Sequence, residues 1–173
     1  MQRRILNRAR MPQDSRPSPT LRLATPADRP RLVATINAAF SIEDFIEGTR
    51  TDEAGLAETM ARGEILLAED PSGHLLGSIY MERRGQRGYL GMLAVDAAHQ
   101  GRGIGRTLLL AAEDRFRAEG LAELEILVLN LRPELVPVYE RFGFKVTGTQ
   151  PFKPSRPLKP GFDCHGVIMT KPL

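Results

Sequence analysis

The chain has 173 residues, of which 42% are hydrophobic and 26% are charged, and these values are typical of one globular domain with a single core. No apolar run approaches the roughly 20 residues that a bilayer span needs, so we expect no membrane association. The net charge of +3 comes from residues 1–20, which hold five arginines and one aspartate, whereas the remainder holds 19 basic and 20 acidic residues. A nucleic-acid binder needs a basic face on the domain itself, and this nearly neutral domain also lacks tryptophan, so no nucleic-acid partner is expected.

Two segments are predicted: a disordered basic extension over residues 1–20 and one folded domain over residues 21–173. The extension is rich in arginine and proline, so an organelle-targeting segment and a start site upstream of Met11 stay open as alternatives. The single cysteine, Cys164, cannot form an internal disulfide, and a reducing cytoplasm is therefore the expected location. We expect a monomer or a homodimer.

Hydrophobic periodicity and turn residues predict the helices and strands in chain order. They are a strand over 21–25, helices over 30–40 and 52–63, strands over 64–69, 74–83 and 89–95, a long helix over 103–120, a strand over 124–129, a short helix over 132–142, and strands over 144–149 and 165–170. Loops over 41–51 and 151–161 separate some of these elements, and the second is rich in proline.

The glycine-rich segment 100–106 lies between an apolar strand and the long helix. Backbone N–H groups in such a turn, with the positive end of the helix dipole behind them, bind phosphate groups. Gly103 and Gly105 let the backbone approach a ligand closely, and Arg102 and Arg106 add positive charge. The glycine spacing does not fit the dinucleotide fingerprint, and the lysine of a nucleotide P-loop is absent.

The pattern Q-x-x-G-x-G after Leu-Ala-Val resembles the acetyl-CoA loop of the GNAT superfamily of N-acetyltransferases. A second block, Tyr-Glu-Arg-Phe-Gly-Phe over 139–144, is similar to a further signature of that family. The resemblance covers about residues 20–173. It implies an α/β (α+β) GNAT fold, with a central, mostly antiparallel mixed sheet of about 6–7 strands flanked by about four helices. It also implies acetyl-CoA as co-substrate and an amine as acceptor.

The resemblance assigns cofactor-binding residues. The pantetheine arm is expected along the backbone of Leu93, Ala94 and Val95, and an N–H near Leu93 is the expected oxyanion donor. The pyrophosphate is expected on the backbone amides of Gln100, Gly101, Arg102, Gly103, Ile104, Gly105 and Arg106. Asn130 is a further candidate for contact with pantetheine, although it lies nine residues before the family tyrosine instead of seven.

The resemblance makes Tyr139 the general acid that protonates the departing thiolate, and packing beneath the sheet is its alternative role. The base is less defined, because Tyr89 stands where many relatives have a glutamate. Glu82 on the neighbouring strand is the next candidate, with a solvated hairpin position as the alternative. A water chain to bulk solvent is a third way to remove the proton.

The acceptor is expected to contact the loop 41–51, where Phe45 and Glu47 are candidate substrate residues, and His165 on a late strand is another. The acids of the loop 41–51 favour a cationic amine as acceptor, whereas the positive charge of the loop 151–161 favours an acceptor that carries negative charge, so the acceptor stays open. The three histidines are scattered in the sequence, and we therefore predict no metal site.

Two other functions are compatible with the sequence. The domain could bind or sense acyl-CoA without catalysis, because the usual acid is absent at Tyr89. It could also be an interaction module recruited through its basic extension.

Overall fold

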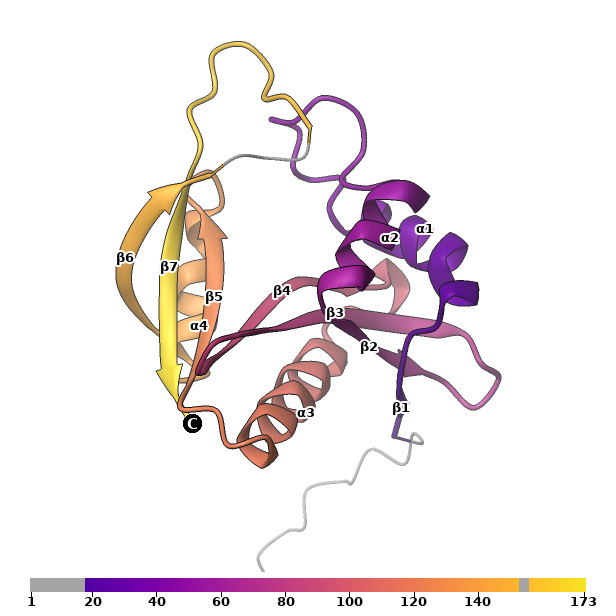
Figure 1. Ribbon diagram of the computed structural model, residues 1–173. Helices are drawn as coiled ribbons and strands as arrows, with labels where there is room; N and C mark the ends of the chain where they lie inside the picture. Colours follow the sequence, from indigo (N-terminus) through magenta and orange to yellow (C-terminus); the bar gives the residue numbers. More distant parts are fainter. Residues whose placement is uncertain (1–17, 153–155) are drawn as a thin grey trace, which may run out of the picture.

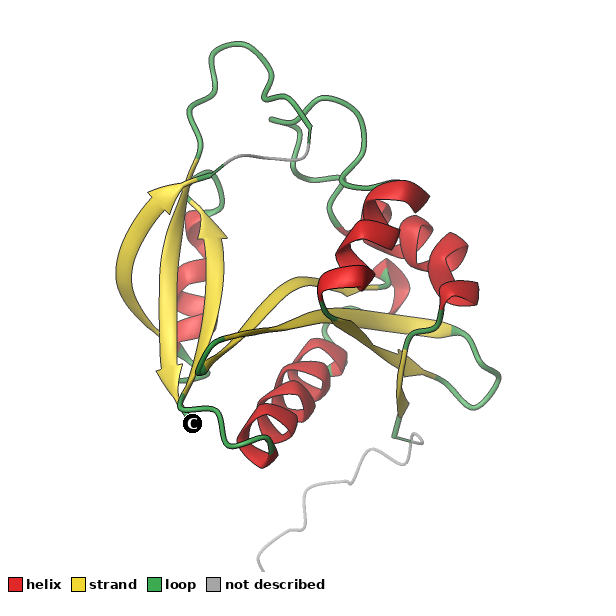
Figure 2. Ribbon diagram, viewed as in Figure 1, coloured by secondary structure: helices red, strands yellow, loops and turns green. Residues whose placement is uncertain are grey.

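The computed structural model describes residues 18–152 and 156–173, and the order of its elements is the one predicted (Figures 1 and 2). The strands are β1 (Thr20–Leu23), β2 (Glu64–Glu69), β3 (Leu75–Arg84), β4 (Arg87–Val95), β5 (Glu123–Leu129), β6 (Lys145–Pro151) and β7 (His165–Pro172). The α-helices are α1 (Arg29–Ala39), α2 (Glu53–Arg62), α3 (Ile104–Ala118) and α4 (Val136–Glu140). Short 3₁₀ turns cover Pro26–Asp28, Ala97–His99 and Pro133–Leu135.

The strands form a 7-stranded mixed sheet in the order β1-β2-β3-β4-β5-β7-β6. Among the strands that the structure describes, only β4 and β5 pair in parallel, and all other neighbours are antiparallel. The predicted fold class, a mostly antiparallel sheet of 6–7 strands with about four helices, is confirmed.

Helices cover both faces of the first half of the sheet, with α1 and α2 on one face and α3 on the other (Figure 2). Both faces of the sheet need a cover because both are apolar, and the side chains of β2 accordingly alternate between two apolar clusters. Ile65 and Leu67 pack with α1 and α2, whereas Leu66 and Ala68 pack in the larger cluster that α3 completes. Within the described residues, no helix has both the length and the apolar character that crossing a membrane requires.

The pairing of β4 with β5 stops halfway along both strands. It runs from Arg87 and Glu123 to Leu90 and Ile126, and beyond that point each strand keeps only its outer partner. Strand β4 stays with β3 as far as Val95, and β5 stays with β7 as far as Leu129. The two halves of the sheet therefore diverge, as Figure 1 shows.

The helix predicted over 132–142 is a 3₁₀ turn followed by only 5 residues of α-helix. Pro133 and Pro137 each remove a backbone donor, which explains the short helix. The predicted extension over residues 1–20 falls mostly on residues 1–17, outside the described part of the chain, and β1 already begins at Thr20.

Candidate functional site

A cavity of about 820 Å³ lies where β4 and β5 diverge. The second halves of both strands form its walls, and residues of β3, α2, the start of α3, α4 and the loop after α1 also line it. Past Leu90, the edge of β4 that faces β5 has no strand partner among the described residues. Its backbone N–H and C=O groups are therefore available to an extended ligand.

Strand β4 carries a bulge inside this cavity. Its pairing with β3 shifts between Ser78 and Tyr80, so that Met92 and Leu93 lie opposite one residue of β3. Met92 has φ 47°, the one positive φ outside glycine in the described chain. A bulge of this kind re-aims the backbone groups next to it. Here it turns the β4 backbone at the point where the cavity begins.

The glycine-rich segment forms one end of the cavity. Gly101 and Gly103 have φ of 73° and 80°, a left-handed conformation that a residue with Cβ adopts only with strain. Gly103 is the N-cap of α3, so the unpaired N–H groups of the first helical turn face this end. The arrangement can hold a phosphate anion.

The other predicted loop residues contribute in different ways. Gln100, Gly105 and Arg106 line the cavity as well. The Ile104 side chain is buried in the core and the Arg102 side chain is exposed, so neither side chain lines the cavity. Leu93 and Val95 lie on the cavity wall, whereas the Ala94 side chain packs in the cluster of α1 and α2.

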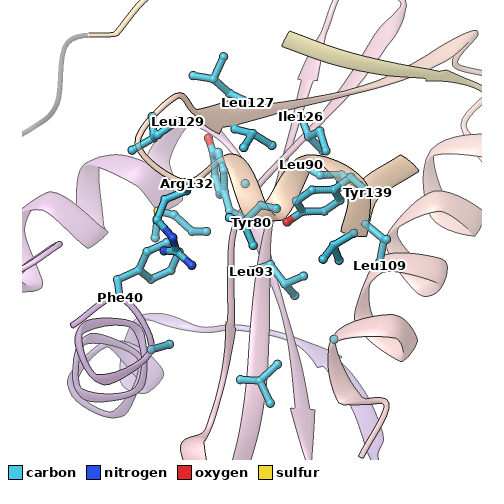
Figure 3. A pocket seen from close by; sticks show the side chains of 18 of the residues that line it. Phe40, Tyr80, Leu90, Leu93, Leu109, Ile126, Leu127, Leu129, Arg132 and Tyr139 are labelled. Atoms are coloured by element: carbon cyan, nitrogen blue, oxygen red, sulfur yellow. The ribbon is translucent and has the colours of Figure 1, made fainter. Parts of the chain in front are cut away.

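Tyr139 lies on the wall of the same cavity, from α4. Figure 3 shows its ring beside Leu93 and Leu109, with the hydroxyl oxygen directed into the cavity. Its ring also packs edge-on against Phe144, at 6.0 Å between centroids. Burial raises the pKa of Tyr139, so its hydroxyl stays protonated at neutral pH.

Both predicted bases, Glu82 and Tyr89, also line the cavity. The Glu82 carboxylate accepts hydrogen bonds from Arg84 at 2.8 Å and from the Tyr80 hydroxyl at 3.0 Å. These contacts, the Arg84 bond first, lower the pKa of Glu82 and weaken it as a base. Burial raises the pKa of Tyr89, whose ring stacks under the Arg84 guanidinium at 3.6 Å.

A third acid, Glu43, reaches the cavity from the loop after α1. It is buried, with Arg50 at 3.1 Å and Arg132 at 3.6 Å from its carboxylate oxygens. Burial raises the pKa of Glu43 and outweighs the opposing effect of the two arginines. The sequence places Glu43 in the expected acceptor loop, but no sequence pattern indicates that it is buried beside Arg132.

The structure does not bring the other predicted substrate residues to the cavity. Phe45 is buried in a separate cluster with Leu129 and Cys164. The Glu47 side chain is exposed, and its backbone N–H donates to Pro157 at 2.9 Å. His165 is exposed on β7 and is not among the residues that line the cavity. The loop 41–51 thus packs on the proline-rich loop and bridges the two halves of the sheet.

Asn130 is also engaged elsewhere. Its side-chain amide donates to the Asp163 carbonyl at 3.2 Å and accepts from the His165 N–H at 2.8 Å. These bonds fix the start of β7, and Asn130 is not among the residues that line the cavity. Asn130 thus lies away from the cavity, and it is also nine residues before Tyr139 instead of the seven that are usual in the family.

Two of the three histidines, although scattered in the sequence, lie close together in the fold. The ring centroids of His74 and His99 are 5.6 Å apart, and Asp96 lies beside both. The strand register explains it: Gly77 pairs with Val95, so the residues before β3 lie beside those after β4.

Residues 37–154 match the profile of the family described as Acetyltransferase (GNAT) domain. The chain belongs to the GNAT acetyltransferase family, and it is therefore an enzyme of the acetyltransferase class. This family membership confirms the resemblance found in the sequence.

Named relatives agree with the family. The chain is 32% identical over 142 residues to a mycothiol acetyltransferase of Propionibacterium freudenreichii, which covers 75% of this chain and 45% of the relative. A mycothiol acetyltransferase of Streptosporangium roseum is 40% identical over 53 residues, 31% of this chain and 16% of the relative. The chain thus spans less than half the length of the curated relatives it matches.

Solved structures share the fold. A ribosomal-protein-alanine N-acetyltransferase from Brucella melitensis is 25% identical with a TM-score of 0.69, over 89% of this chain and 99% of that one. A GNAT phosphinothricin acetyltransferase from Sinorhizobium meliloti, solved in complex with AcCoA, is 21% identical with a TM-score of 0.69, over 90% of this chain and 89% of that one.

Proposed function

We propose that this protein transfers the acetyl group of acetyl-CoA directly to a primary amine of a small molecule or peptide. The observation that carries this proposal is the cavity between the diverging strands, which has a phosphate-type loop at one end and Tyr139 on its wall. Neighbours of the same fold that were solved with acetyl-CoA support the choice of donor.

In this proposal the backbone of the enzyme holds the donor. The pyrophosphate binds the N–H groups around Gly101 and Gly103 and at the start of α3. The pantetheine arm extends along the free edge of β4 as an added strand. The thioester carbonyl then lies at the bulge, where a backbone N–H near Leu93 stabilises the tetrahedral oxyanion.

The chemistry requires a neutral amine. A lysine-like amine has a pKa near 10.4, so roughly one molecule in 2,500 is neutral at pH 7. The amine attacks the thioester carbon, loses a proton, and the tetrahedral intermediate then expels the CoA thiolate. Tyr139 donates its proton to the sulfur, and its raised pKa keeps that proton available until the thiolate forms.

Among the carboxylates that line the cavity, Glu43 is our proposed proton acceptor. A buried carboxylate with a raised pKa is a stronger base than one held in a close ion pair. Glu82, whose pKa is lowered chiefly by Arg84, is the weaker alternative. Tyr89, whose pKa is raised by burial, is ionised too rarely to act as a base at neutral pH.

The donor half of the proposal is tested at Gly103. A valine there needs a strained φ near 80° and places its side chain in the phosphate loop. A valine-bearing loop relaxes out of this conformation in the free protein and must regain it on binding, so strain of about 1–3 kcal/mol predicts an affinity for acetyl-CoA that is roughly 5- to 150-fold lower. Gly85→Val is the matched control, because Gly85 has φ 62° in the β3–β4 turn, away from the cavity. Calorimetry should show normal acetyl-CoA binding for this control, and equal losses in both variants would contradict the proposed loop.

The chemical half is tested by thiol release from acetyl-CoA with a panel of amines. The panel includes a mycothiol-type acceptor, because relatives carry that name. Tyr139→Phe should lower kcat by about ten-fold or more, whereas Tyr89→Phe, which removes a hydroxyl from the same cavity, should have a smaller effect. If acetyl-CoA raises the melting temperature but no amine is acetylated, a non-catalytic acyl-CoA-binding domain becomes the better explanation.

A further inference from the structure

Three potential metal ligands converge outside the acetyl-transfer cavity. They are His74, just before β3, and Asp96 and His99, just after β4. His99 Nδ1 lies 2.5 Å from an Asp96 carboxylate oxygen, and His74 Nε2 lies 3.8 Å from the same oxygen. All three ligand atoms lie within 4.8 Å of one another.

The backbone holds these residues in place. Asp96 donates its N–H to the Leu76 carbonyl at 2.9 Å, which extends the pairing of β3 with β4 by one step. His99 donates its N–H to the Asp96 carbonyl at 2.8 Å, and this turn brings the imidazole back over the carboxylate. The His74 N–H donates to the Asp70 carboxylate at 2.9 Å. The three side chains therefore start from anchored positions on two different segments.

We propose that His74, Asp96 and His99 bind a divalent transition-metal ion of the Zn²⁺ class, with water as the fourth ligand. Two imidazole nitrogens and a carboxylate oxygen are ligands that Zn²⁺ takes in tetrahedral sites. Ligand atoms about 2.1 Å from a tetrahedral ion lie about 3.4 Å from one another, between the two separations observed here. Small rotations of the side chains are enough to reach that geometry.

The role of this site is structural. None of the three residues lines the cavity, and His99 directly precedes Gln100, the first residue of the glycine-rich segment. A bound ion would tie the β2–β3 turn to the segment that leads into that loop. Since residues 74 and 96–99 meet only in the folded chain, the ion would stabilise the folded state.

The test uses the full-length, untagged, metal-stripped protein and Zn²⁺ as the probe. Calorimetry should show one equivalent bound, and Co²⁺ in its place should give the visible absorption of a tetrahedral site. His74→Asn and His99→Asn should each lower the affinity about ten-fold or more. His165→Asn is the matched control, since this third histidine is exposed on β7, and it should bind Zn²⁺ like the wild type.

A melting experiment separates binding at this site from misfolding. The His74 side chain is 56% exposed, so His74→Asn should melt like the wild type in the presence of a chelator. Zn²⁺ should then raise the melting temperature of the wild type and of His165→Asn but not of His74→Asn. The proposal is overturned if the wild type binds no Zn²⁺, if His74→Asn binds as tightly, or if His165→Asn loses as much affinity.

Discussion

Two buried carboxylates, Asp28 and Glu43, have similar surroundings, but their pKa values are shifted in opposite directions. Asp28 is 5% exposed and Glu43 is 6% exposed, and each lies beside two arginines. Hydrogen bonding, from Arg22 first, lowers the pKa of Asp28 far below its usual range. Burial raises the pKa of Glu43.

The number of hydrogen bonds explains the difference. The Asp28 carboxylate accepts two bonds from Arg22, at 2.7 and 2.9 Å, and two from the Thr25 N–H and hydroxyl, at 2.7 and 3.0 Å, besides the bonds from Arg31. Glu43 has one bond from Arg50 at 3.1 Å and the more distant Arg132. A satisfied buried carboxylate stabilises a fold, whereas an under-bonded one can accept a proton. We therefore read Asp28 as structural and Glu43 as functional.

Replacing Asp28 should have the largest effect on stability. Asp28→Asn removes one of the two carboxylates that Arg22 and Arg31 share and leaves the other, Glu69, so it should lower the free energy of unfolding by about 1–3 kcal/mol. Denaturant unfolding measures this change. The acetylation rate per folded molecule should stay close to that of the wild type, because Asp28 is not among the residues that line the cavity.

The same contrast predicts how stability depends on pH. Asp28 is ionised in the folded protein and titrates near pH 4 when unfolded, so its contribution is present above about pH 4 and is lost as the pH falls below it. The contribution of Glu43 to stability changes with pH in the opposite direction. Because the pKa of Glu43 is raised in the folded protein, the folded state becomes less stable as the pH rises toward that pKa. Stability measured from pH 3 to pH 7 should fall toward acid in the wild type and be flatter in Asp28→Asn. An unchanged slope would contradict the assignment of Asp28.

These two carboxylates also show what the sequence could predict. The phosphate-type loop was predictable because one short segment, 100–106, carries its glycines and helix start. The order of elements followed from local patterns, and the largest difference in length is the helix predicted over 132–142, which Pro133 and Pro137 shorten to α4. The Glu43 site depends on Arg132, which follows β5 and is 89 residues away in the chain, and no local pattern encodes that approach. The pair His74 and His99 was predictable in principle from the register of the β3–β4 hairpin.

Glu43→Gln should affect activity more than stability. The amide keeps the shape of the side chain but cannot accept a proton, so kcat/KM should fall about ten-fold or more at neutral pH, which is about 1.4 kcal/mol of barrier. The loss of stability should be smaller than for Asp28→Asn, because fewer hydrogen bonds are affected. Steady-state kinetics with the best amine of the panel measures the first effect. Normal kinetics in this variant would remove Glu43 as the proton acceptor.

Glu82→Gln should give the smallest effect and is the matched comparison within the cavity. Both acids line the cavity and both contact an arginine, but the pKa of Glu82 is lowered, chiefly by Arg84. A carboxylate that is ionised well below neutral pH is a weak base, so its replacement should change kcat/KM by less than about three-fold. The pH profile should also stay like that of the wild type, whereas Glu43→Gln should lose the acidic limb that reports the base. If Glu82→Gln removes that limb and Glu43→Gln keeps it, the two roles are exchanged, and the tight pairing with Arg84 must open when the acceptor binds.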